Sequence, residues 1–224
     1  MAIAGSIRSV DKHAADTAVV EAEGKIAPGL RSVNAGNWEP SPLRLNTLFG
    51  RGPEERSARD LYIAVVEQAR QPWFYRGIGV PDTLDGRFEM IVLHAYIVVN
   101  RLRGIGDAGG RVAQSLFDQM FADMDRNLRE IGVGDLSVGK QVKAMAKRFY
   151  GSVNAYGQGL EAADGGVLGA AIARNVYGRI TPPDGAAEAL SGYLRREVAA
   201  AALIGDDELL AGQIRFGAPP GRAD

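Results

Sequence analysis

The chain has 224 residues, no cysteine, two histidines and a formal net charge of −1. Without cysteine there can be no disulfide scaffold, Cys-ligated zinc, iron–sulfur cluster or thiol catalysis, and two histidines, His13 and His94, exclude a multi-histidine metal site. The near-neutral charge argues against a protein whose whole surface is built to bind nucleic acid.

Residues 1–52 contain Gly, Pro, Asn and Ser without steady periodicity, which is typical of a loop or flexible arm. The start lacks the basic and apolar regions of a secretory signal, and it is too acidic for a typical mitochondrial transit peptide. The longest apolar run of the chain, Met90 to Val99, is shorter than the ~18–20 residues that a membrane-spanning helix needs. We therefore expect a flexible arm followed by a domain that does not span a membrane.

Apolar residues at helical spacing predict three helices after the arm. The first begins near Pro53, which suits a first helical turn, and Pro72 stops it. The second starts with Asp85 as its cap and ends at Gly104; because it is apolar nearly all round, it should lie at the centre of a bundle. The third covers residues 111–131. Two (i, i+4) ion pairs are expected on its exposed face, namely Asp125 with Arg129 and Arg126 with Glu130.

A fourth helix is predicted over residues 138–163, with Ser137 as a good N-cap and apolar residues every three or four positions. Two further helices, over 165–178 and 185–205, are separated by two prolines, and no strand pattern of useful length is present. The predicted fold is all-α, a single bundle of about six helices. The expected segments are the arm (1–52), the helical domain (53–204), and a short turn with a disordered C-terminal tail (205–224).

Gly104, Gly106 and Gly109 match the G-x-G-x-x-G pattern, and a helix follows them. A dinucleotide-binding fold needs a buried strand that leads directly into the first glycine. Polar residues occupy that position here, and the apolar run before them has helical spacing. We favour a turn between two helices. A nucleotide-binding enzyme that uses the Gly104–Gly109 turn remains the alternative.

His94 lies inside the predicted central helix. As a haem ligand it would need His13, which lies in the arm, and as a general base it lacks partners that the sequence can place. We favour a histidine that is hydrogen-bonded locally in the core. The carboxylates also lack the Glu-x-x-His pairs of di-iron bundles. The sequence therefore predicts no catalytic set, no metal and no cofactor.

Lys140, Lys143 and Lys147 lie on one face of the fourth helix, opposite its apolar stripe. An ordinary solvated face is the simplest interpretation. However, Lys140 and Lys143 come early in the predicted helix, where its dipole disfavours a cation by ~0.3–1 kcal/mol each. This placement hints at an anionic partner, and a ribosome- or RNA-associated module using this face is a further alternative.

Two ordered motifs resemble the ubiquinol–cytochrome c chaperone family: "VPDTLDGRFE" (80–89) and "MDRNLREIGVGDLSVGKQVK" (124–143). The resemblance spans roughly residues 57–163. It implies a non-enzymatic helical assembly factor of the cytochrome bc1 complex, with cytochrome b or another bc1 subunit as its hydrophobic client. Mitochondrial relatives associate with newly made cytochrome b, beside a small partner protein and near the ribosomal exit.

The resemblance brings no catalytic residues. It implies a bacterial cytoplasmic protein, peripheral at the inner membrane, or a protein on the matrix side of a mitochondrion, and no contact with DNA. The family motifs and the lysine face together give the candidate residues for client or partner binding: Asp82, Arg87, His94, Arg103, Lys140, Lys143, Lys147 and Tyr150.

Overall fold

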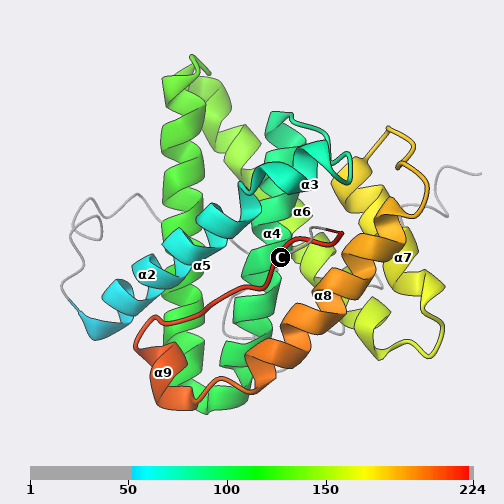
Figure 1. Ribbon diagram of the computed structural model, residues 1–224. Helices are drawn as coiled ribbons and strands as arrows, with labels where there is room; N and C mark the ends of the chain where they lie inside the picture. The colour runs from blue at the N-terminus through cyan, green and yellow to red at the C-terminus, as the bar shows by residue number, and fades with distance from the viewer. Residues whose placement is uncertain (1–51, 222–224) are drawn as a thin grey trace, which may run out of the picture. The chain divides into compact units, whose positions relative to one another are not determined.

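The computed structural model describes residues 52–221, which are largely helical and contain no strand. The predicted all-α fold is therefore confirmed, and each of the six predicted helices is present. The predicted arm, except for Gly52, lies outside the described residues. The helices are α2 (Pro53–Ala69), α3 (Pro72–Arg76), α4 (Leu84–Leu102), η3 (Arg103–Ile105), α5 (Gly106–Glu130), α6 (Asp135–Glu161), α7 (Gly166–Ile172), η4 (Ala173–Tyr177), α8 (Ala186–Ala202) and α9 (Asp206–Leu210) (Figure 1).

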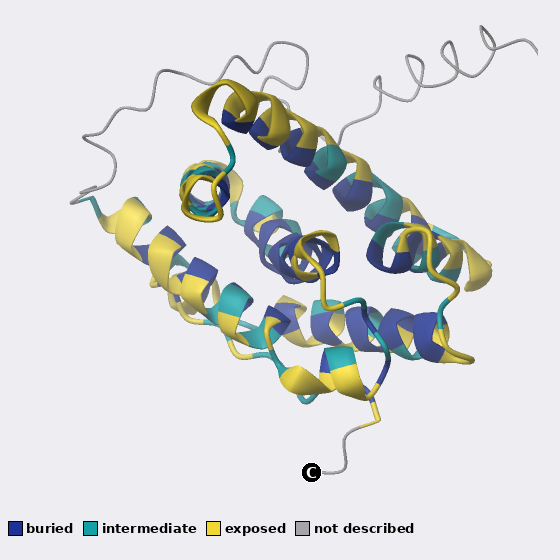
Figure 2. Cartoon of the chain, turned by 90° about the horizontal axis from the view of Figure 1, so that it is seen from above, coloured by how far each residue is buried: buried dark blue, intermediate teal, exposed yellow. Residues whose placement is uncertain are grey.

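Helix α4 is the centre of the bundle. Of its 19 residues, 14 are buried, and it packs against α2, α5, α6 and α8. Figure 2, which looks along this helix, shows it buried on nearly every side. This arrangement follows from the sequence, because a helix that is apolar all round must be surrounded to remove its surface from water. None of the helices between residues 52 and 221 is both long and apolar enough to cross a membrane.

Two predicted N-terminal caps, those of α4 and α6, are wrong. Thr83, and not Asp85, caps α4, because its Oγ1 accepts a hydrogen bond from the Gly86 N–H at 3.1 Å. Helix α6 begins at Asp135 and not after Ser137. Asp135 suits the positive end of the helix, and its carboxylate pairs with Arg129 of α5. Each true start lies two or three residues before the residue that the sequence favoured.

The prediction of a disordered C-terminal tail is wrong for residues 215–221, which pack against the bundle. The segment leaves α9 and runs back toward α3 (Figure 1). The Trp73 indole N–H donates to the Pro220 carbonyl at 2.8 Å, and the Gly217 N–H donates to the Glu197 carboxylate at 2.8 Å. These bonds use backbone groups, so hydropathy patterns could not predict them.

The glycine motif forms a turn between two helices, as favoured above. Its first glycine lies in η3, directly after α4, so the strand of a dinucleotide-binding fold is replaced by a helix. Helix α5 starts at Gly106, five residues earlier than predicted. Gly109 lies so close to α4 that an added Cβ would be 2.0 Å from the Leu102 carbonyl oxygen, whereas the neighbouring Gly110 has nothing within 4 Å. Gly109 is therefore required for the close approach of α4 and α5.

This contact predicts opposite effects for two neighbouring substitutions. Gly109→Ala should lower the free energy of unfolding by about 1–3 kcal/mol, the usual cost of overpacking. Gly110→Ala should leave it unchanged or raise it by up to ~1 kcal/mol, because alanine favours the helix. Urea denaturation of both variants measures the difference. Equal stability of the two variants would show that the close approach at Gly109 is not needed.

Candidate functional site

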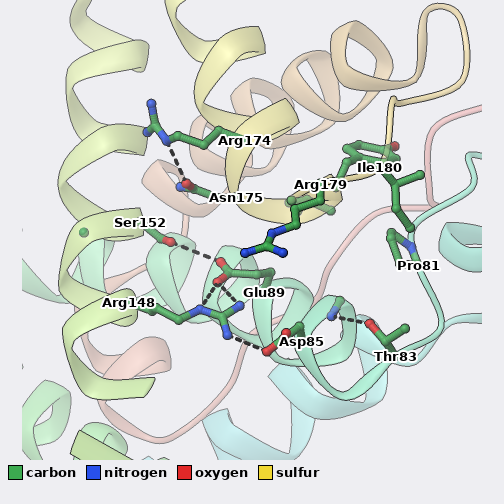
Figure 3. Close-up of a pocket in the computed structure, with 15 residues that line it drawn as sticks. Pro81, Thr83, Asp85, Glu89, Arg148, Ser152, Arg174, Asn175, Arg179 and Ile180 are labelled. Carbon is green, nitrogen blue, oxygen red and sulfur yellow. Dashed lines mark hydrogen bonds and ion pairs between the residues drawn. The ribbon is translucent and has the colours of Figure 1, made fainter. Parts of the chain in front are cut away.

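A pocket of about 520 Å³ lies between the start of α4, the middle of α6 and the π-helical segment η4 (Figure 3). Such a volume is within the range of small-ligand sites. The pocket combines one buried and one exposed carboxylate with three guanidinium groups, an amide and hydroxyl groups. The charged and polar residues that line it are Thr83, Asp85, Glu89, Arg148, Ser152, Arg174, Asn175, Tyr177 and Arg179.

Glu89 lies on the wall of this pocket and is only 2% exposed. Arg148 Nη2 donates to one carboxylate oxygen at 2.8 Å, and the Ser152 hydroxyl donates to the other at 3.0 Å. Burial raises the pKa of Glu89 above its ordinary value, although Arg148 and Ser152 act in the opposite direction. The carboxylate is thus held by two residues of α6 and is available to little else.

Arg148 connects α6 to the first turns of α4. In addition to Glu89, its guanidinium contacts Asp85 at 2.5 Å and lies over the Phe88 ring, 5.2 Å from the centroid. Planar guanidinium groups suit such combined ionic and stacked contacts. Arg148 therefore forms ion pairs with both carboxylates of the pocket.

The remaining guanidinium groups come from the segment that follows α7. Arg174 donates through Nε to the Asn175 side-chain oxygen at 3.2 Å. Arg179 points toward Glu89 in Figure 3 but has no hydrogen bond or ion pair within the described residues. The π-helical turn carries Arg174 and Asn175. Such turns occur frequently at functional sites.

The predicted site residues do not assemble into one site. Asp82 and Arg87 are exposed and pair with each other at 2.6 Å beside the pocket. Arg103 lies at the opposite end of α4, where burial lowers its pKa. The Tyr150 ring packs against Phe117 at 5.5 Å, and burial raises its pKa to about 12. The last two side chains are thus partly buried.

The lysine face is confirmed as solvent-exposed, since Lys140, Lys143 and Lys147 are all exposed on α6. However, the dipole argument does not hold. Because α6 begins at Asp135, Lys140 is its sixth residue and lies beyond the first turn, where the dipole acts. The row leads by helical spacing to Gly151, which lines the pocket. The positive face and the pocket are therefore neighbours.

His94 is fully buried and locally hydrogen-bonded, as favoured above. Its Nδ1 donates to the Met90 carbonyl at 2.7 Å, so Nε2 accepts from the Tyr193 hydroxyl at 2.8 Å. Gln68 in turn donates to Tyr193 at 2.9 Å and to the Gly217 carbonyl at 2.8 Å. In this conformation His94 offers no atom to a partner. It joins α4 to α8, α2 and the C-terminal segment.

Sequence reasoning missed Glu89, Arg148, Arg174 and Arg179. One signal was available for Glu89, since a carboxylate on a helix that is apolar all round needs a buried cation. No such signal pointed to Arg174 or Arg179, which are exposed. Within residues 52–221, no three or more His, Asp or Glu side chains gather closely enough to hold a metal ion.

Residues 76–216 match the protein family described as Ubiquinol-cytochrome C chaperone. The ubiquinol-cytochrome-c reductase complex assembly factor 1 of Xenopus laevis is 26% identical over 70% of this chain and 79% of its own length. The mitochondrial protein CBP3 of Saccharomyces cerevisiae is 29% identical over 66% of this chain but only 45% of its own length. The match to the family extends beyond residue 163, where the resemblance of the motifs ended.

The crystal structure of the Cbp3 homolog from Brucella abortus has a similar fold. Its TM-score with this chain is 0.67 at 36% sequence identity, over 77% of this chain and 96% of that chain. The family match includes all lining residues of the pocket and the lysine face.

The burial of His94 predicts a pH-dependent stability. Burial lowers its pKa to about 4, against 6.5 for an exposed imidazole. Between these values the unfolded chain binds a proton that the folded chain does not, so stability present at neutral pH is lost as the pH falls from 6.5 through 4. The loss should be about 3 kcal/mol, at ~1.4 kcal/mol per pKa unit.

His94→Gln should reduce this pH dependence, because glutamine does not titrate. Urea denaturation at pH 7, 5.5 and 4.5 gives the slope for both proteins, and titration of the other groups cancels in the difference. Identical slopes would contradict a buried neutral His94.

Proposed function

Because this chain belongs to the ubiquinol-cytochrome C chaperone family, we propose that it is a non-enzymatic assembly factor of a cytochrome bc1 complex. The family match over residues 76–216 is the observation that carries the proposal. The names of the Xenopus and other vertebrate relatives describe assembly factors of ubiquinol-cytochrome-c reductase. The saturated hydrogen bonding of His94 and Glu89 also supports a binding role, since neither group is free to transfer a proton.

The proposed client is a hydrophobic bc1 subunit, cytochrome b in the first instance, and a small partner protein and the ribosome are further proposed partners. The protein would act in the bacterial cytoplasm at the inner membrane, or on the matrix side of a mitochondrion. We assign client or partner contact to the exposed candidates and use His94 only as internal support. The exposed candidates are Asp82, Arg87, Lys140, Lys143 and Lys147.

A ribosome- or RNA-associated role is the second candidate function. It is favoured by the three exposed lysines on a single face of α6. Contacts of lysine with phosphate weaken steeply as salt rises. Salt-dependent sedimentation with ribosomes would therefore distinguish this role from client binding through apolar contacts.

The assembly role predicts that deletion of the gene lowers the amount of assembled bc1 complex. The deletion strain should lose cytochrome b haem absorbance and quinol oxidation, and the wild-type gene should restore both. A pull-down from solubilised membranes should enrich cytochrome b or another bc1 subunit. Normal haem spectra and normal quinol oxidation in the deletion strain would reject the role.

The lysine face can be tested without disturbing the core. Lys143 has an interaction of its own, so Lys140→Glu with Lys147→Glu is the suitable variant. Its stability should stay within about 0.5 kcal/mol of wild type, as usual for exposed positions. Its association with anionic vesicles or ribosomes should fall at low salt, because each basic residue near an anionic membrane contributes ~1 kcal/mol.

Arg59→Glu with Arg76→Glu changes the net charge equally at exposed positions on α2 and α3, and it is the matched control. The control variant should sediment like wild type. Equal loss in both variants would mean that net charge, and not the α6 face, governs association. Unchanged sedimentation of the lysine variant would indicate an ordinary solvated face.

A further inference from the structure

We propose that the pocket between α4, α6 and η4 binds a carboxylate carried by an acidic segment of a partner polypeptide, with Arg179 as its main contact. The proposal goes beyond the assembly role, because it names the chemistry that one particular cavity recognises. It rests on the geometry of the pocket alone.

The first observation is that the pocket has unused donors for an anion. Its two carboxylates, Asp85 and Glu89, both form ion pairs with Arg148. Within the described residues the other two guanidinium groups form no ion pair with a carboxylate: Arg174 bonds the Asn175 amide, and Arg179, although it points toward Glu89, makes no hydrogen bond. Three arginines against two acids leave an excess of one positive charge. The lining therefore favours an anionic guest.

The second observation is that the backbone holds Arg179 at the pocket. Gly178 has a φ of 62°, a conformation that L-residues rarely adopt, and it reverses the chain immediately before Arg179. The turn is closed by the Ile180 N–H, which donates to the Tyr177 carbonyl at 3.0 Å. The buried Tyr177 hydroxyl donates to the Ile78 carbonyl at 2.9 Å. The position of Arg179 is therefore set by a built turn that is tied to the segment between α3 and α4.

The third observation concerns which anion fits. A guanidinium fork matches a planar carboxylate, which it binds with two parallel hydrogen bonds. A doubly charged phosphate would carry more negative charge beside Asp85 and Glu89, where only one net positive charge is available. The cavity of about 520 Å³ is also much larger than a single carboxylate. A monovalent carboxylate attached to a larger group is therefore the better guest.

The rim and its surroundings indicate that this larger group is polypeptide. Ile180, which is 58% exposed, and Pro81 both line the pocket, so an apolar side chain next to the carboxylate would find a contact. Lys147 lies one helical turn before Gly151 of the lining and continues the positive surface along α6. A segment with alternating acidic and apolar residues would satisfy both features.

The test uses the full-length protein and a fluorescein-labelled peptide with the sequence Gly-Leu-Glu-Leu-Glu-Leu-Glu-Gly, followed by fluorescence anisotropy. The wild-type protein should bind it saturably, and the same peptide with glutamine in place of glutamate should bind at least tenfold more weakly. Arg179→Ala should weaken binding at least tenfold. The affinity of Arg179→Lys should lie between those of the wild-type protein and Arg179→Ala. Arg59→Ala, an exposed arginine on α2 away from the pocket, should bind within twofold of wild type.

Competition separates a peptide site from a site for small free anions. Succinate or inorganic phosphate at 10 mM should displace little of the peptide at constant ionic strength. Complete displacement would overturn the polypeptide part of the proposal. Equal binding by Arg179→Ala, equal binding of the glutamine peptide, or no saturable binding at all would overturn the whole proposal. Because purified components are used, the outcome is independent of the bc1 assembly test, and thermal melting of each variant verifies folding.

Discussion

The complete burial of helix α4 is the constraint on which the rest of this structure depends. An apolar helix surrounded by four others leaves no water for the polar groups on it, so each must find a partner in a neighbouring helix. Glu89 is satisfied from α6 by Arg148 and Ser152, and His94 is satisfied from α8 by Tyr193. These two contacts fix the positions of α6 and α8 around the central helix more specifically than apolar packing alone would do.

The same constraint explains why the C-terminal segment belongs to the bundle. The Tyr193 hydroxyl donates a hydrogen bond to His94 and accepts one from Gln68. Gln68 donates a second hydrogen bond to the Gly217 carbonyl. The Phe216 ring lies edge-on to His94, with centroids 5.2 Å apart. The segment therefore completes the surroundings of the buried histidine. This agrees with a family match that continues to residue 216.

The helical spacing of apolar residues was sufficient to predict the six main helices, the central place of α4 and the internal role of His94. These features depend on local patterns, which a sequence displays directly. The helix starts were harder to predict, because several polar residues near each start could serve as the cap. At the start of α6, Asp135 also pairs with Arg129 of α5, a contact that the local sequence does not show. The pocket could not be predicted, since its charges meet only after segments 59 or more residues apart come together. The dipole argument for the lysines failed for the simple reason that the helix starts three residues earlier.

The buried polar groups and the exposed charges of the chain have different uses, and their hydrogen bonding separates them. A buried polar or charged group without partners is costly, so Glu89 and the neutral His94 have their hydrogen bonds satisfied and contribute to a unique arrangement of helices. An exposed guanidinium remains hydrated at little cost, so Arg179 can stay without a partner and keep its donors for a guest. In this pocket the two kinds of charge are adjacent. Arg148 makes ion pairs with both fixed carboxylates, so the donors of Arg179 stay available, and the lining as a whole keeps an excess of one positive charge. The stability of the bundle and the availability of the pocket thus follow from the same pairing of Arg148 with Glu89.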